Sequence, residues 1–330
     1  MRKDSLGDRM KGYENINRNY LTKRVPVIIR LDGKSFHTFT KGLNRPFDDI
    51  LISTMQETAR YLCENIQGCK IAYTQSDEIT LLLTDYDSID TQGWFEYNIQ
   101  KMVSISSSMA TLQFNRIFEK NIKEWNNNFI KNGIEMTDKQ IDYFYLLNNK
   151  LINGAIFDSR VFSIPKEEVN NCFVWRQQDA TRNSIQTVGQ SNFSHKHLHK
   201  KSCNMIQDML FKEKGINWND YETPLKRGTC IVKEEYLKET DKESVMRTRW
   251  IIDKNIPIFS EDKNYIEQYV FLDNNKKLDS IFDNMSDKEF EDILNKYGFK
   301  YEKVEPGKGE MFIDGEVFKK IQYNEELTLL

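Results

Sequence analysis

The feature that most constrains the fold is an apolar run near the N-terminus that ends abruptly in polar residues. The stretch VPVIIRLDGKSF at residues 25–36 opens with an apolar run, Val25 to Ile29, that is interrupted only by Pro26 and is typical of a buried β-strand. The strand is expected to stop at the Arg30-Leu31-Asp32-Gly33 segment, which leaves the Asp32 carboxylate at a sheet edge. Gly33 lets the backbone turn and exposes its carbonyl beside that carboxylate.

A second stretch of the same kind follows at residues 69–83. Its sequence, CKIAYTQSDEITLLL, predicts two strands joined by a tight turn, with Ser76, Asp77 and Glu78 at the tip and the start of the return strand. Paired strand ends carrying Asp32 and Asp77 would make a hard oxygen site for Mg²⁺, as two-metal nucleotidyl transfer requires. Taken singly, each motif is more often an ordinary turn. The pair is a stronger indication because both acids follow apolar strands and a helix separates them.

The order of the segments predicts the α+β class, with a β-α-β-β-α-β ferredoxin-like arrangement like that of polymerase palms. Asp48 is expected to cap a helix that Gly68 ends, and a long helix is expected from Trp94 to about Phe118. Residues 155–164 are expected to form a strand pair or a kinked strand that Pro165 stops. Residues 119–153 favour no assignment. In this topology the first and third strands are central, which would bring the two aspartates into range, although a fold alone does not establish function.

Beyond Pro165 the composition changes. We therefore expect a palm-like catalytic domain at residues 1–164 and a C-terminal helical and strand region at residues 165–330 that binds RNA or assembles. The ranges expected to form helices are 6–13, 167–188, 191–212 and, opened by a capping box, 287–296, and those expected to form strands are 229–233, 246–253 and 309–323.

Composition excludes several classes of protein. A hydrophobic fraction of 39% with 20 Phe and 15 Tyr excludes global disorder, and no stretch of about 18 apolar residues predicts a membrane span. The first residues lack the apolar core of a signal peptide, and five cysteines without a C-x-x-C pair favour reduced thiols, so a cytoplasmic location is expected. The net charge of −3 means that a polyanion must be held by a local patch.

The histidines at positions 195, 197 and 199 suggest zinc, but no acid neighbours them, and on a helix only the first and last share a face. A phosphate-binding patch with Lys196, Lys200 and Lys201 is favoured over zinc and is weighed evenly against a solvated helix face. Two further features each have a functional and a structural interpretation of equal weight. Trp175-Arg176 can clamp a base or make an ordinary amphipathic contact, and Lys101 can reach a phosphate or project into solvent. The sequence contains no Walker loop or G-x-G-x-x-G motif.

Five motifs together identify a family. R-L-D-G-K-S-F-H, Y-T-Q-S-D-E, F-D-S-R-V, W-R-Q-Q-D and K-R-G-T resemble, in order and over roughly residues 5–233, the tRNA-His guanylyltransferase family. Its members are nucleotidyltransferases that add nucleotides to RNA 5′ ends in the 3′–5′ direction. The resemblance implies two Mg²⁺ ions as cofactors, GTP and ATP as substrates, tRNA as partner, and a homotetramer.

Matching the motifs residue by residue implies the site. Asp32 and Asp77 would ligate metal together with the Gly33 carbonyl, and Glu78 stands where the family has its third catalytic acid. The implied nucleotide-binding residues are Asp32, Gly33, Lys34, Ser35, Phe36, His37, Arg45, Ser76 and Asp77. Arg30, Lys101 and Arg160 fall at family positions associated with triphosphate or RNA contacts, and the full set expected to make such contacts adds Trp175, Arg176, Asn183, Lys196, Lys200 and Lys201.

One departure from the family pattern matters for the substrate. Classical members carry His-Ile-Asn after W-R-Q-x-D, in a region tied to anticodon recognition, and here Thr181 replaces that histidine. With the segment Ser194–Ser202, this is similar to the guanylyltransferase-like branch associated with templated repair of truncated tRNA 5′ ends. The alternatives are a dedicated enzyme that adds one G to tRNA-His, a palm-fold nucleotide cyclase, and a non-catalytic RNA-binding protein. The three intact acids argue against the last.

Overall fold

The computed structural model describes residues 5–239, 244–271, 300–304, 308–313 and 316–320. The chain divides into two compact units, Met1–Phe271 and Leu272–Leu330. The second unit contains an antiparallel sheet of β7 (Lys300–Val304), β8 (Lys308–Ile313) and β9 (Glu316–Lys320), so strands form where residues 309–323 predict them. The helix expected at residues 287–296 lies outside the described residues.

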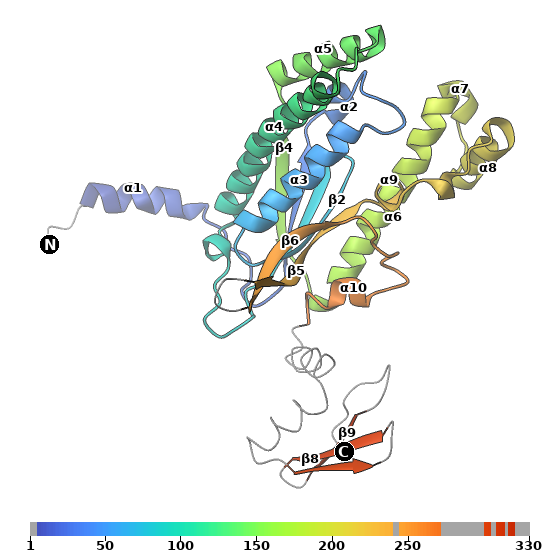
Figure 1. Ribbon diagram of the computed structural model, residues 1–330. Coiled ribbons are helices and arrows are strands. Elements are labelled where there is room, and N and C mark those ends of the chain that lie inside the picture. The colour runs from blue at the N-terminus through green and yellow to red at the C-terminus, as the bar shows by residue number, and fades with distance from the viewer. Residues whose placement is uncertain (1–4, 240–243, 272–299, 305–307, 314–315, 321–330) are drawn as a thin grey trace. The chain divides into compact units, whose positions relative to one another are not determined.

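The first unit is built on an antiparallel sheet with the strand order β4-β1-β3-β2-β5-β6 (Figure 1). Its strands are β1 (Val27–Gly33), β2 (Cys69–Gln75), β3 (Glu78–Leu83), β4 (Phe157–Ser163), β5 (Thr229–Glu239) and β6 (Ser244–Asp253). The first four strands have the ferredoxin-like order with β1 and β3 in the centre, so the predicted α+β palm-like fold is confirmed. Because β5 pairs with β2, residues 165–271 share this compact unit with the palm. The functional division after residue 164 stays a prediction.

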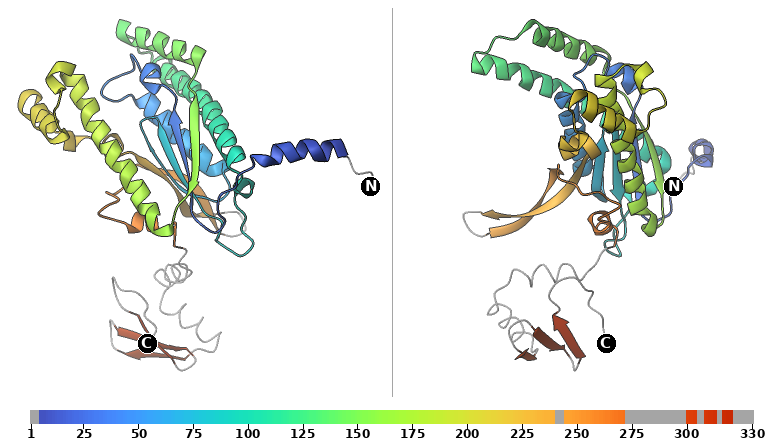
Figure 2. Two further views of the ribbon diagram at one scale, coloured as in Figure 1. Left: turned by 180° about the vertical axis from the view of Figure 1, so that it is seen from behind. Right: turned by 90° about the vertical axis from the view of Figure 1, so that its right-hand side faces the viewer.

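Helices cover both faces of this sheet (Figures 1 and 2). Val27, Ile29 and Leu31 of β1 pack with α3 (Asp49–Asn65) and α4 (Ile99–Asn132), whereas Ile28 packs with α6 (Lys166–Asn192) and α10 (Asn264–Glu267). Since side chains alternate along a strand, Arg30 and Asp32 face α6. The remaining helices are α1 (Ser5–Ile16), α2 (Phe36–Phe39), α5 (Asp138–Asn153), α7 (His195–Leu198), α8 (Cys203–Lys214), α9 (Thr223–Arg227) and the 3₁₀ turns η1 (Trp94–Tyr97) and η2 (Trp218–Asp220). None of the described helices combines the length and the apolar composition that crossing a bilayer requires.

Strand β1 ends within the segment where its end was predicted, but the expectation that Asp32 follows the strand was wrong. Strand β1 runs to Gly33, because its pairing with β3 and β4 continues through the registers Asp32–Glu78 and Asp32–Asp158. Asp32 therefore lies within the sheet, and its carboxylate has strand neighbours on both sides.

The expected start of the long helix at Trp94 was also wrong. Phe95, Glu96 and Tyr97 have φ values of 50°, 53° and 62°, a left-handed conformation that a right-handed helix cannot include. Helix α4 begins after Asn98, whose side chain accepts the Lys101 backbone N–H at 3.0 Å. It continues to Asn132, and α5 follows, so these helices occupy most of residues 119–153.

The single helix expected at residues 191–212 is instead three pieces. Helix α6 extends to Asn192, and α7 and α8 each begin at a serine whose hydroxyl accepts a backbone N–H, Ser194 from His197 at 3.4 Å and Ser202 from Met205 at 3.3 Å. The histidine run therefore lies on and beside a one-turn helix. Within the described part of the chain, no group of three or more His, Cys, Asp or Glu could hold a metal ion, which gives the zinc interpretation no support.

Candidate active site

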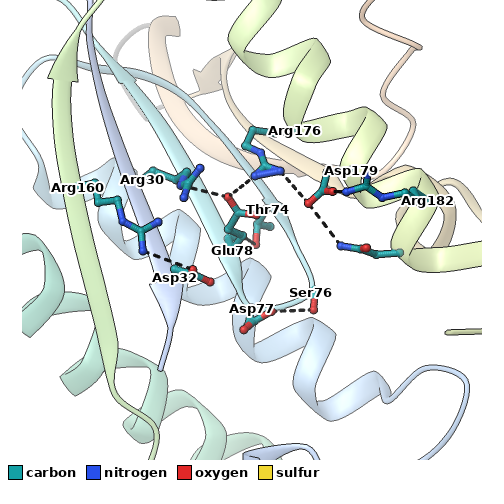
Figure 3. A network of polar contacts seen from close by, with 11 residues as sticks. Arg30, Asp32, Thr74, Ser76, Asp77, Glu78, Arg160, Arg176, Asp179 and Arg182 are labelled. Atoms are coloured by element: carbon teal, nitrogen blue, oxygen red, sulfur yellow. Dashed lines mark hydrogen bonds and ion pairs between the residues drawn. The ribbon is translucent and has the colours of Figure 1, made fainter. Parts of the chain in front are cut away.

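Three carboxylates lie in a row across strands β4, β1 and β3, on the sheet face that α6 covers. Asp32 is the register partner of Asp158 on one side and of Glu78 on the other. Two residues back along β1, Arg30 stands beside Arg160 of β4 in the same way. The sheet thus sets a row of acids next to a pair of guanidinium groups, and Figure 3 shows Asp32 and Glu78 of that row with Arg30 and Arg160.

Asp77 joins this row from the turn between β2 and β3. The Gly33 N–H donates to the Asp77 carbonyl oxygen at 3.1 Å, which ties the turn to the end of β1. Ser76, in a left-handed conformation with φ 49°, donates its hydroxyl to Asp77 Oδ1 at 2.9 Å. Burial raises the pKa of the Asp77 carboxyl, the Ser76 hydrogen bond counters the rise, and the charge of Asp32 adds to it. The hydrogen bond from Gly33 to Asp77 therefore brings the β2–β3 turn beside the end of β1, as the sequence predicts.

Glu78 has a different environment from the two aspartates. Its Oε1 lies 3.1 Å from Arg176 Nη1 and 3.4 Å from Arg30 Nε, and Arg176 also contacts Asp179 Oδ2 at 2.8 Å (Figure 3). Burial raises the pKa of Glu78, and Arg176 and Arg30 counter that rise. Both guanidinium groups also lie over the half-exposed Trp175 ring, at 3.9 Å for Arg176 and 5.4 Å for Arg30. Glu78 is thus the counter-ion of an arginine pair.

The donor atoms at Asp32 and Asp77 fit Mg²⁺. Two carboxylates and the Gly33 carbonyl are hard oxygens, and Mg²⁺ in nucleotide enzymes is usually held by one or two carboxylates together with substrate phosphates and water. Among the described residues, no group of three or more His, Cys, Asp or Glu side chains is arranged to hold a metal ion by itself, so the Gly33 carbonyl, substrate phosphates and water would have to complete the coordination.

The residues expected to bind the nucleotide continue from β1 into α2. Lys34 and His37 are exposed, and Ser35 is exposed in a left-handed conformation with φ 54°. Phe36 is instead buried, with its ring 5.1–5.7 Å from those of Phe39, Phe114 and Phe157. Only the backbone of Phe36 is available to a nucleotide.

Arg45 lies exposed in the loop before α3, and Asp48 anchors this loop. The buried Asp48 carboxylate accepts the backbone N–H groups of Asn44 and Leu51, both at 3.0 Å, and the Tyr143 hydroxyl at 2.5 Å. Helix α5, which the sequence did not predict, therefore fixes the loop that carries Arg45.

The predicted triphosphate and RNA residues fall into three places. Arg30, Arg160, Trp175 and Arg176 surround the acids, and Asn183 Nδ2 lies 3.5 Å from Asp179 Oδ2 on α6. Lys101 is on the first turn of α4, on the other face of the sheet, over the Phe95 ring at 5.8 Å. The exposed lysines at positions 196, 200 and 201 lie on and after α7.

Two acids of the site were missed by sequence reasoning. The first is Asp158, which lies two residues before the predicted Arg160 on β4, so the alternation of side chains along a strand could have placed it on the same sheet face. Asp179 lies three residues after Arg176 on α6, a spacing that puts side chains on one helix face.

The chain is similar to known proteins over the region that carries this site. Residues 7–165 match the family model described as tRNAHis guanylyltransferase. A bacterial tRNA(His) guanylyltransferase (Thg1)-like protein, solved in complex with ATP, is 44% identical with a TM-score of 0.67, and the match covers 82% of this chain and all of that one. A bacterial protein of the same description in complex with GTP is 42% identical with a TM-score of 0.64, covering 81% and 100%. The tRNA(His) guanylyltransferase of Debaryomyces hansenii is 28% identical over 237 residues, 68% of this chain and 79% of the relative.

The family match at residues 7–165 spans β1 to β4 and includes Asp32, Asp77, Glu78 and Asp158. With 44% identity over the whole length of a Thg1-like protein, the chain belongs to the tRNAHis guanylyltransferase family of nucleotidyltransferases.

Proposed function

We propose that this protein is a Mg²⁺-dependent 3′–5′ nucleotidyltransferase that repairs tRNA 5′ ends under the direction of a template base. The observation that carries the proposal is the tie between β1 and the β2–β3 turn, where the Gly33 N–H reaches the Asp77 carbonyl at 3.1 Å and brings Asp77 beside Asp32. The relatives solved with ATP and with GTP support these nucleotides as substrates.

Asp32, Asp77 and the Gly33 carbonyl would hold two Mg²⁺ ions. When bound, Mg²⁺ supplies charge neutralisation for phosphates and lowers the pKa of an attacking hydroxyl. The exposed segment of residues 34–37, the Ser76 hydroxyl and Arg45 would bind the nucleotide beside this pair of acids.

The reaction would join the 3′-hydroxyl oxygen of the incoming nucleotide to the activated 5′-phosphorus of the RNA, and the activating phosphate group would leave. Arg30 and Arg160 lie two residues from Asp32 and Asp158 along their strands, and their charge cannot be lost by deprotonation. Placed there, they would stabilise the negative charge that develops on the leaving group. Glu78 would keep Arg30 and Arg176 in position for this task.

For RNA, the exposed Lys196, Lys200 and Lys201 offer a cationic surface on a chain with a net charge of −3. Lys226, further along, is less available, because its ammonium group donates to the Asn219 carbonyl at 2.6 Å. A cytoplasmic homotetramer completes the proposal, on the family resemblance.

Template direction rather than anticodon reading is favoured by Thr181, which stands on α6 where classical members have histidine. A palm site can position an incoming nucleotide opposite a template base, so that base pairing selects it. Anticodon reading needs a separate binding surface, and the segment that would supply it is altered here. The dedicated G-adding enzyme remains the second candidate, because the matching relative in Debaryomyces hansenii is a tRNA(His) guanylyltransferase.

The test uses 5′-truncated tRNAs that differ only in anticodon, each with varied bases opposite the missing position, incubated with Mg²⁺ and labelled nucleoside triphosphates. Repair should follow the opposing base and ignore the anticodon. Addition of G alone, and only with the His anticodon, would identify the dedicated enzyme. A small cyclic product from nucleotide alone would indicate a cyclase, and an Asp32→Ala variant with unchanged RNA affinity and biological effect would indicate a non-catalytic binding protein.

A further inference from the structure

Asp158 belongs to the acid row but neither to the proposed metal ligands nor to the ion pairs that surround Glu78. It is the register partner of Asp32 on β4, and the two side chains share a sheet face. Like charges directly opposite each other in a sheet are unfavourable, so a second acid beside a metal ligand needs a counter-charge.

Arg160 supplies that counter-charge and divides it between the two acids. Its Nη2 lies 3.3 Å from Asp158 Oδ2 and 3.9 Å from Asp32 Oδ2 (Figure 3 shows the second contact). The nearer partner is thus Asp158. Glu78, on the other side of Asp32, is neutralised separately by Arg30 and Arg176.

A guanidinium group next to a metal-ligating carboxylate competes with the metal, because both are cations and the guanidinium cannot lose its proton. If Asp158 were neutral, Asp32 would be the remaining carboxylate in reach of Arg160, and their contact would shorten. Asp158 therefore offers Arg160 an alternative partner at the edge of the site.

We propose that Asp158 is a positioning residue that holds Arg160 away from Asp32, so that Asp32 stays available to the metal while Arg160 remains beside the site for phosphate. The inference rests on the proposed metal site. It concerns how that site is kept open and does not make Asp158 a ligand.

The experiment measures Mn²⁺ binding to the full-length protein by electron paramagnetic resonance of the free ion, with no nucleotide present. Asp158→Asn should weaken binding about 10-fold, the size typical of residues that orient metal ligands. Arg160→Gln should bind at least as tightly as the wild type. The double variant should recover the affinity of Arg160→Gln, because no competing guanidinium remains. Asp90→Asn, an exposed acid in the loop beyond the opposite end of β3, is the charge-matched control and should change nothing.

Two results would overturn the inference. The first is unchanged Mn²⁺ affinity in Asp158→Asn. The second is a double variant that binds Mn²⁺ as weakly as Asp158→Asn, which would mean that Asp158 ligates the metal or attracts it directly by its charge. Asp32→Asn separates this from the proposed function. If it leaves Mn²⁺ binding intact, the metal site itself is wrong, and the inference fails with it. If it abolishes binding while Asp158→Asn does not alter it, only the inference fails. Thermal melts of each variant confirm folding, which an exposed aspartate should not affect.

Discussion

Replacing Glu78 by glutamine should destabilise the fold, although Glu78 lies in a predicted catalytic site where losing a charge often helps stability. Its carboxylate faces two guanidinium groups, at 3.1 Å for Arg176 and 3.4 Å for Arg30, and the side chains are 14%, 7% and 18% exposed, respectively. Arginine stays charged in proteins, so Glu78→Gln leaves two largely buried cations with less counter-charge.

The magnitude follows from that burial. Removing one partner of a fully buried ion pair costs about 3–5 kcal/mol, and the residual exposure together with the Arg176–Asp179 contact at 2.8 Å reduces the expected loss to about 2–3 kcal/mol. For a unit of this size that lowers the melting temperature by about 4–12 °C. Burial raises the pKa of Glu78, so the desolvation of its carboxylate opposes the stabilisation that its contacts with the two arginines provide, and urea unfolding at pH 7 decides which of the two is larger.

The assay is urea unfolding of the wild type, Glu78→Gln, Arg176→Met and the double variant. The free energy of unfolding of the double variant should fall by less than the sum of the two single losses, by about 0.5–3 kcal/mol. Each single variant leaves one charge of the Glu78–Arg176 pair without its partner, whereas the double variant removes both charges. Glu124→Gln is the control, because Glu124 is 63% exposed in a 3.8 Å pair with Lys120 and should change stability by less than about 0.5 kcal/mol. A Glu78→Gln loss as small as the control's would refute the assignment of Glu78 as a structural counter-ion.

Three further variants have expected outcomes. Asp77→Asn should abolish nucleotide addition yet stabilise the metal-free fold at pH 7 by about 1 kcal/mol. Burial raises the pKa of Asp77 in the folded protein above its unfolded value of about 3.9. The wild type therefore has its full stability below the unfolded pKa and loses part of it as the pH rises through the folded pKa. The difference in melting temperature between Asp77→Asn and the wild type should accordingly disappear in acid. Gly33→Ala should cost about 1–3 kcal/mol in urea unfolding, because its Cβ would lie 2.1 Å from the packed Phe36 ring. Tyr143→Phe should raise the nucleotide KM with kcat little changed, because the Asp48 carboxylate that fixes the Arg45 loop loses one hydrogen bond.

The sheet and the aspartate pair could be predicted from the sequence because both depend on local information. Apolar runs predict β1 and the two strands of the β2–β3 hairpin. Only two residues separate Gln75 from Glu78, so the connection between these strands is a tight turn. The ferredoxin-like order then brings Asp32 and Asp77 together without any knowledge of side-chain packing.

What could not be predicted depends on residues far apart or on unusual backbone conformations. The Arg176 contact to Glu78 joins positions 98 residues apart and exists only because α6 crosses the sheet face at that height. The late start of α4 comes from positive φ at Phe95, Glu96 and Tyr97, which none of these residue types signals. The break after α6 was signalled by Ser194 and Ser202, two capping residues, but an apolar pattern that continues past them concealed it.

The distribution of charge in the site favours the Asp32–Asp77 pair as the place for the proposed cation. Among the described residues, Glu78 faces the buried Arg176 and the partly buried Arg30, and Asp158 and Asp32 share the half-exposed Arg160. The carboxylate of Asp77 accepts a hydrogen bond from the Ser76 hydroxyl. Positive charge therefore falls off across the site toward the Asp32–Asp77 pair, where burial makes uncompensated negative charge most costly. A divalent cation would therefore stabilise the site most when bound at that pair. Without a bound cation, these two acids contribute least to the stability of the fold. The same deficit is why Asp77→Asn is expected to trade activity for stability, whereas Glu78→Gln loses stability outright.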